Sequence, residues 1–294
     1  MPKYRLEQAE KERFAVYQVI YADADIEMWY DWNTRLKDTQ FSDQCYWILC
    51  DEVRIGGAII NDGTVMYPFL IAPFADRTVF WRALFNCSHD IKHINGVLQQ
   101  DVSILLAFGY KLGVIRQVMC CPADDSVTAV LPDGFSVRSL DKTTDINTIA
   151  RIIMEGYAGG IDNETYGIPD EAKATADVQH LMKVYEHRNF SLYVFDEQEQ
   201  AIAGLCIAGI YEKMPLGVAE IGDLCVLPKY RNIRLAEAML NYVRATAHEY
   251  SQVVKLCVTV GNEAENLYRK VGFYPGPRFA NMSKRNEFAG FHSL

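Results

Sequence analysis

Residues 221–273 combine strand and helix patterns in an order that constrains the fold more than any other part of the chain. IGDLCVLP predicts a strand, KYRNIR a basic turn, and LAEAMLNYVRATAHEY an amphipathic helix. VVKLCVTV then predicts a second strand, and GNEAENLYRKVGF a turn that leads into a short helix. The first N–H groups of a helix have no partner within it and attract anions, so the turn around Arg231 is expected to hold phosphate.

This order of segments resembles the acetyl-CoA-binding core of the Gcn5-related N-acetyltransferase (GNAT) superfamily. The resemblance rests on LCVLPKYR, a small residue that opens the helix, Asn262, Tyr268 and the pair Gly272-Phe273. It covers residues 190–284 most clearly and fades toward the N-terminus. It implies an α/β fold in which a mixed, mostly antiparallel sheet is flanked by helices, with acetyl-CoA as the acyl-donor substrate.

The resemblance also implies where the donor binds. Two strands would splay apart, and backbone groups of Leu224, Cys225 and Val226 would face the pantetheine arm between them. Gly222 is either the bulge that splays the first strand or an ordinary glycine in a buried strand. The pyrophosphate would face the turn and the helix start, which are Arg231, Asn232, Ile233, Arg234, Leu235 and Ala236.

One residue of this turn departs from the family pattern. Arg234 stands where the family has a glycine that lets backbone N–H groups approach phosphate. An arginine there either adds a compensating positive charge or weakens cofactor binding.

Candidate catalytic residues lie on the first of the two strands and on the last helix. By resemblance, Tyr268 protonates the leaving thiolate, although its helix face also suits a core tyrosine. Asn262 either contacts the pantetheine or an ordered water, or caps the helix. Glu220 and Asp223 are alternative general bases, and either carboxylate also suits an ion pair across the sheet. His180, His187 and His248 are expected at the surface.

The chain is expected to contain two domains built on one plan. PADDSVTAVLPDG, within residues 122–134, predicts a linker between a first domain, 1–121, and an acetyl-CoA-binding domain, 135–294. Aligning the halves places Asp76 opposite Arg231 and Trp81 opposite Ala236, so the first domain is interpreted as a degenerate GNAT-like copy that binds no CoA. Gln99 and Leu105 stand opposite Asn262 and Tyr268.

Composition excludes several other functions. The net charge of −9 argues against nucleic acid or an anionic membrane as the main partner. The longest apolar run, Ala201–Tyr211, is too short to span a bilayer, and the charged N-terminus lacks a signal-peptide pattern. The eight cysteines form no C-x-x-C pair, which favours reduced thiols in a cytoplasmic protein. No metal-ligand spacing occurs, so no metal is expected.

We therefore expect an N-acetyltransferase, an acyltransferase that moves acetyl from acetyl-CoA to an amine of a small molecule or peptide. The alternatives are a non-catalytic CoA-binding or protein-interaction module of the same fold, and an enzyme for a longer acyl chain. The acceptor is expected to meet residues 157–166, residues 212–217 and the segment after Phe273. The sequence carries no signal for an oligomeric state.

Overall fold

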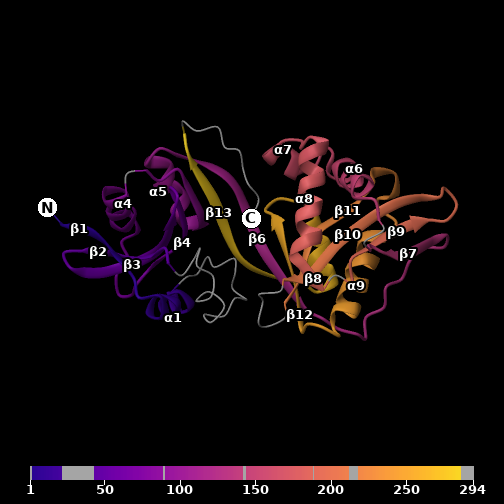
Figure 1. Cartoon of the computed structure of the whole chain (residues 1–294), viewed down its shortest axis with the longest axis horizontal. Helices are drawn as coiled ribbons and strands as arrows, with labels where there is room; N and C mark the ends of the chain where they lie inside the picture. Colours follow the sequence, from indigo (N-terminus) through magenta and orange to yellow (C-terminus); the bar gives the residue numbers. More distant parts are fainter. Residues whose placement is uncertain are drawn as a thin grey trace. The chain divides into compact units, whose positions relative to one another are not determined.

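The computed structural model describes residues 2–21, 43–88, 90–141, 144–187, 189–211 and 218–285 (Figure 1). They form two compact units. Unit 1 contains the described residues up to Gln117 and those from Pro277 onward, and unit 2 is Val118–Gly276. Each unit has a mixed, mostly antiparallel sheet flanked by helices, which confirms the expected fold class. The expected acceptor segment 212–217 lies outside the described residues.

The sheet of unit 1 has the strand order β1-β2-β3-β4-β5-β13-β6. The β4–β5 pair is parallel, whereas the β1–β2, β2–β3, β3–β4 and β5–β13 pairs are antiparallel. Its strands are β1 (Tyr4–Gln8), β2 (Cys45–Cys50), β3 (Val53–Asn61), β4 (Thr64–Leu70), β5 (His93–Leu98), β6 (Tyr110–Pro122) and β13 (Tyr274–Lys284). Its helices are α1 (Lys11–Tyr21), α4 (Arg77–Cys87) and α5 (Val102–Ala107), with a 3₁₀ turn, η1 (Gln99–Asp101).

The sheet of unit 2 has the order β6-β12-β11-β10-β9-β7, and β8 also pairs with β10. Here the β11–β12 pair is parallel. The strands are β7 (Phe135–Ser139), β8 (Tyr185–His187), β9 (Leu192–Asp196), β10 (Ala201–Tyr211), β11 (Ala219–Val226) and β12 (Val253–Thr259). The helices are α6 (Ile146–Tyr157), α7 (Ile161–Tyr166), α8 (Glu171–Val184), α9 (Leu235–Ala247) and α10 (Ala264–Val271), with a 3₁₀ turn, η2 (Pro228–Tyr230).

Helices cover both faces of the sheet in unit 2. Successive side chains of a strand point to opposite faces, so β10 contributes Cys206 to one core cluster and Leu205 to the other. Met239 and Val243 of α9 fill the first cluster, and α6 and α8, which lie side by side (Figure 1), fill the second. The alternating apolar pattern of the sequence therefore corresponds to a sheet buried on two sides.

The structure supports the internal duplication. In each unit an antiparallel hairpin, β3–β4 or β10–β11, is followed by a helix and a parallel strand. The register of each hairpin shifts by one residue, because β4 carries an extra residue near Tyr67 and β11 carries Gly222. A shared bulge at the same place in the same order of elements is difficult to obtain from unrelated folds.

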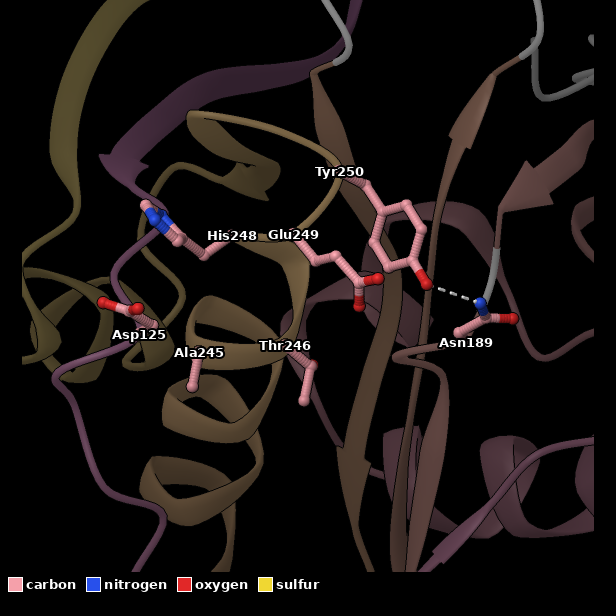
Figure 2. A pocket seen from close by; sticks show the side chains of 7 residues that line it. All are labelled: Asp125, Asn189, Ala245, Thr246, His248, Glu249 and Tyr250. Atoms are coloured by element: carbon pink, nitrogen blue, oxygen red, sulfur yellow. Dashed lines mark hydrogen bonds between the residues drawn. The ribbon is translucent and has the colours of Figure 1, made fainter.

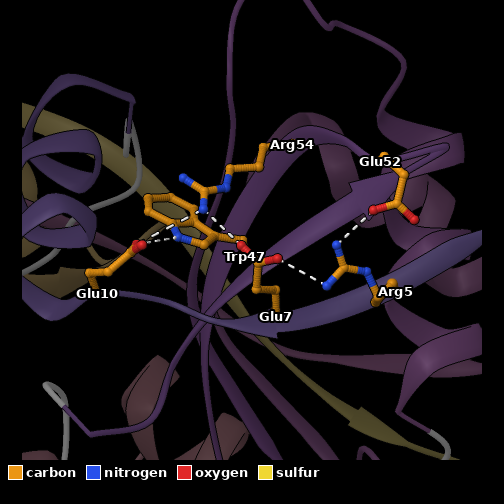
Figure 3. A network of polar contacts seen from close by, with 6 residues as sticks. All are labelled: Arg5, Glu7, Glu10, Trp47, Glu52 and Arg54. Atoms are coloured by element: carbon orange, nitrogen blue, oxygen red, sulfur yellow. Dashed lines mark hydrogen bonds and ion pairs between the residues drawn. The ribbon is translucent and has the colours of Figure 1, made fainter.

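A network of charged side chains lies on the edge of the unit 1 sheet (Figure 3). Arg54 donates to Glu7 at 2.7 Å and its guanidinium lies 5.0 Å from the ring centre of the fully buried Trp47. Arg5 bridges Glu7 and Glu52. Both arginines of the network are thus engaged by carboxylates of the same unit, and their role is to join β1, β2 and β3.

The C-terminal strand completes unit 1 rather than unit 2, which differs from the expected division at residues 122–134. Phe279, Ala280 and Met282 pair with β5 of unit 1. Residues 118–122 of β6 belong instead to the sheet of unit 2, where Met119 and Cys121 are buried in the core. The two strands have similar apolar patterns, and such a pattern does not specify which of two similar sheet edges a strand joins.

This arrangement predicts how fragments behave. A fragment of residues 135–294 lacks the two core side chains of β6 and leaves β13 without its partner strand, and each lost burial costs roughly 1.5–3 kcal/mol. We expect it to aggregate or to unfold at a lower temperature than residues 118–276, measured by size-exclusion chromatography and thermal unfolding with the full chain as reference. Equal solubility and equal melting temperature of the two fragments would contradict this strand assignment.

Candidate active site

The two central strands of unit 2 part at a defined point. Parallel pairing between β11 and β12 runs over three residues and ends at Ile221, opposite Leu256. Gly222 has no partner in β10, because Ile207 pairs with Asp223 and the next residue of β10 pairs with Ile221. Gly222 is therefore the β-bulge that one of the two sequence interpretations predicted, and beyond it the backbone of residues 224–226 has no strand partner on the β12 side.

Packing explains why this bulge is a glycine. A Cβ atom on Gly222 would lie 2.7 Å from the Tyr185 hydroxyl oxygen and 3.1 Å from a methyl carbon of Leu181. A larger residue would push α8 and the start of β8 away from β11. The close approach of these elements and the splay of the strands thus depend on the same residue.

The turn after β11 leads into an uncapped helix. Asn232 and Arg234 both have left-handed backbone conformations, with φ of 66° and 67°. Arg234 is the N-cap position of α9, and its side chain makes no capping hydrogen bond to the helix. The left-handed conformation accounts for the glycine of the family pattern, because a side chain there costs about 1–2 kcal/mol. The Arg234 side chain is 74% exposed and lies 3.6 Å from Glu237.

Arg231 is held by backbone carbonyl groups. Its Nη2 donates to the Gly156 carbonyl oxygen at 2.8 Å and its Nε to the Val226 carbonyl oxygen at 3.4 Å. The arginine that the sequence assigned to phosphate therefore joins the turn to the end of α6 and the end of β11. The positive charge of the guanidinium stays at the turn, and its two hydrogen bonds hold the backbone around it in place.

Asp223 follows the bulge and lies at the mouth of the splay. Tyr157, the last residue of α6, donates from its hydroxyl to Asp223 Oδ1 at 3.1 Å and lies 3.5 Å from the Leu224 carbonyl oxygen. Burial raises the pKa of Tyr157 well above its usual value, and the nearby Asp223, Cys225 and Tyr268 raise it further. The phenol is therefore a neutral donor at physiological pH, and the structure brings Asp223 and Tyr268 to the same region.

Tyr157 is a residue whose role the sequence did not indicate, because it appeared only as the start of the acceptor segment. Its partner Asp223 is 66 residues away, and no local spacing connects them. The available signal was its position at the end of an amphipathic helix, next to the glycine pair 159–160.

Glu220 occupies a different environment. It is the register neighbour of Lys255 across the β11–β12 pair, and the two charged groups are 3.7 Å apart. Lys255 is buried, and a buried ammonium group requires a counter-charge. The structure thus places Glu220 in an ion pair within the part of the sheet that is closed by strand pairing.

Asn262 lies one residue before Glu263, the N-cap of α10. Its Oδ1 accepts from the Ala264 N–H at 3.0 Å, and its Nδ2 donates to Asp162 Oδ2 at 3.2 Å. Its side chain thus contacts the first residue of α10. Asp162 belongs to α7, so this contact also fixes the expected acceptor segment beside the end of β12.

Tyr268 lies on α10, six residues after Asn262. It is partly buried against the core cluster that α9 fills, with its ring centre 6.0 Å from that of Phe273. It also lies near enough to Tyr157 to raise the pKa of that phenol. Tyr268 therefore packs against the core and also lies near the splay of the strands. From the sequence alone, a core role and a catalytic role are alternatives.

In unit 1 the equivalent anion site is closed. Parallel pairing of β4 and β5 also ends early, at Met66 opposite Asn95. The N-terminus of α4, however, is capped by Asp76, whose Oδ1 accepts from the Val79 N–H at 2.9 Å. Trp81 is fully buried. A carboxylate thus occupies the helix end that corresponds to the uncapped start of α9.

A surface depression in unit 2 lies at the opposite end of α9 (Figure 2). It has a volume of about 410 Å³ and is lined by His248, Glu249 and Tyr250, with Asn189 donating to the Tyr250 hydroxyl at 2.9 Å. His248, expected at the surface, is partly buried beside the Ala123 carbonyl oxygen. His180 is exposed as expected, and the His187 side chain lies outside the described residues.

Within the described residues, no three His, Cys, Asp or Glu side chains gather as a metal-binding group. No helix in this part of the chain is long and apolar enough to cross a membrane.

Comparison with known proteins finds a family model that matches most of unit 2. Residues 160–273 match the family model described as Acetyltransferase (GNAT) family. A search of curated proteins found no matching relative. The similar solved structures include a GCN5-related N-acetyltransferase from Sphaerobacter thermophilus, at 14% identity and a TM-score of 0.67, covering 95% of this chain and 94% of that chain.

Two further structures extend the likeness over nearly the whole chain. An acetyltransferase of the GNAT family from Colwellia psychrerythraea is 12% identical, with a TM-score of 0.54, covering 96% of this chain and 99% of that one. A tandem GNAT protein from the clavulanic acid biosynthesis pathway is 13% identical, with a TM-score of 0.50, covering 96% and 98%. At these identities the likeness shows the fold. Residues 160–273 thus match the GNAT acetyltransferase family model, and the fold of the whole chain is similar to that of tandem GNAT proteins.

Proposed function

We propose that unit 2 is an N-acetyltransferase that transfers an acetyl group from acetyl-CoA to an amine of a small molecule or peptide. The observation that carries this proposal is the splay of β11 and β12 beside the uncapped N-terminus of α9. The family match of residues 160–273 supports the same reaction class.

The donor would bind along this opening. Backbone groups of Leu224, Cys225 and Val226 have no strand partner on the β12 side and suit the amides of a pantetheine arm. The pyrophosphate would meet the N–H groups from Asn232 to Ala236, where the helix dipole favours negative charge. The exposed guanidinium of Arg234 adds a cation there, which favours compensation for the missing glycine. Asn262 would shape the site through its hydrogen bond to the start of α10.

Asp223 and Tyr268 suit the two proton transfers of the reaction. The acceptor must lose a proton before its nitrogen attacks the thioester carbonyl, and the departing thiolate must gain one. Asp223 lies beyond the bulge, whereas Glu220 is engaged with Lys255, so we assign the base to Asp223. Tyr268 is the acid by its position on α10. A CoA-binding module without catalysis would not need a carboxylate and two phenols at the splay.

Reversing the charge at Arg231 tests the donor site. Arg231→Glu removes the bonds to Gly156 and Val226 and places a carboxylate at the phosphate turn. We expect acetyl-CoA to bind roughly 10-fold to 100-fold more weakly, because a charge-assisted contact is worth about 1.5–3 kcal/mol. Calorimetric titration measures this, with Arg151→Glu, an exposed arginine of α6 paired with Glu171, as the charge-matched control. Equal affinities of the wild type and Arg231→Glu would remove the turn from the donor site.

Two carboxamide substitutions separate the candidate bases. Asp223→Asn should lower kcat by roughly 10²-fold to 10⁴-fold, the range for one acid–base group, with little change in melting temperature. Glu220→Gln should remove the carboxylate that lies 3.7 Å from the buried Lys255 and cost roughly 1–3 kcal/mol of stability, while kcat of the folded protein stays within a few-fold. Thiol release and thermal unfolding measure both effects. The reverse pattern would identify Glu220 as the base.

A further inference from the structure

The last two residues of α6 contact two different parts of the site. The Gly156 carbonyl oxygen accepts from Arg231 in the phosphate turn, at 2.8 Å. The adjacent Tyr157 donates to Asp223 at the mouth of the splay, at 3.1 Å. One short stretch of backbone therefore joins the turn that would hold the donor phosphates to the carboxylate that would meet the acceptor.

The end of α6 is held tightly in this place. A Cβ atom on Gly156 would lie 2.7 Å from the Cβ of Cys225, so only glycine lets α6 lie this close to β11. On the preceding turn, the Ile152 carbonyl oxygen lies 3.8 Å from the Cys225 sulfur. Ile149 and Ala150 anchor the helix in the core. The Tyr157 ring thus has little freedom to leave Asp223.

Titratable groups on β10, β11, α10 and the phosphate turn lie near this pair. Burial raises the pKa of both neighbouring thiols, Cys206 on β10 and Cys225 on β11, so they are neutral at physiological pH. Tyr268 on α10 faces Tyr157, and Arg231 of the turn faces Cys225. The Tyr157 hydroxyl donates to the Asp223 carboxyl group, and such a donor favours the charged form of a carboxylate.

We propose that Tyr157 is a positioning residue that holds the Asp223 carboxylate for the ammonium group of the acceptor, and that the acceptor is a primary alkylamine without an adjacent carboxylate. This inference rests on the proposed function. An α-amino acid would bring its own carboxylate next to Asp223, and two like charges in a partly buried site repel each other. The Gly156–Arg231 bond ties the placement of Tyr157 to the phosphate turn.

The proton balance of the step is complete. Asp223 takes one proton from the ammonium group, and the free amine nitrogen forms a C–N bond to the thioester carbonyl carbon. The C–S bond breaks, and Tyr268 gives a proton to the sulfur. The nitrogen loses a second proton to solvent, and the Tyr268 phenolate takes up one proton from solvent. The proton on Asp223 then also leaves to solvent. The products are an N-alkylacetamide, CoA thiol and one proton per turnover.

Removing one hydroxyl group tests the positioning role. Tyr157→Phe keeps the ring and should raise the pKa of Asp223, because the charged carboxylate loses a donor. The acidic limb of the pH profile of kcat/KM should move upward by roughly one unit, since a hydrogen bond to a charged group is worth about one to two pKa units. The assay follows thiol release with propylamine. Tyr193→Phe, at a tyrosine packed against the same core cluster, is the matched control and should keep the wild-type limb.

Two further measurements distinguish positioning from a general loss of stability. In an Asp223→Asn background, Tyr157→Phe should change kcat/KM less than three-fold, because the group it positions is absent. Wild type should acetylate propylamine at least 10-fold faster than 2-aminobutyrate, which adds only an adjacent carboxylate.

The possible results separate the inference from the proposed function. If calorimetry shows no acetyl-CoA binding to the wild type, the proposed function fails. Binding with propylamine turnover but an unchanged acidic limb in Tyr157→Phe, or an equal shift in Tyr193→Phe, overturns the positioning role alone. A preference for 2-aminobutyrate, or binding without any turnover of propylamine, overturns the acceptor class.

Discussion

The candidate site depends on the early end of strand pairing between β11 and β12. The Gly222 bulge breaks the register with β10, and from there the backbone of residues 224–226 lacks a neighbour on the β12 side. A residue with a side chain would meet Tyr185 and Leu181. One small residue therefore controls strand pairing, helix packing and the accessibility of backbone polar groups.

The two units show that this frame alone does not make an anion site. Unit 1 has the same early end of parallel pairing and a helix after it, yet Asp76 caps that helix and Trp81 fills its core side. In unit 2 the helix start is uncapped and lies beside Arg231 and Arg234. The difference between the two helix starts is electrostatic and local.

Much of this could be predicted from the sequence, because the signals are local. The strands and helices of unit 2 follow from apolar periodicity, and the bulge at Gly222 and the carboxylate at Asp76 occupy positions that alignment of the two halves or of the family motif reveals. The destination of β13 could not be predicted, because β5 and β12 offer similar edges. Two contacts also could not be predicted, Tyr157–Asp223 and Glu220–Lys255, because only the folded sheet brings the residues of each pair together.

The central claim is that acetyl-CoA binds at the start of α9 and not at the equivalent helix of unit 1. Hydrogen exchange of the full chain, with and without saturating acetyl-CoA, tests this most directly because it reports on the backbone N–H groups themselves. The account predicts slower exchange at residues 224–226 and 232–237, with unchanged exchange at residues 77–80. Protection at residues 77–80, or none at residues 232–237, would contradict it.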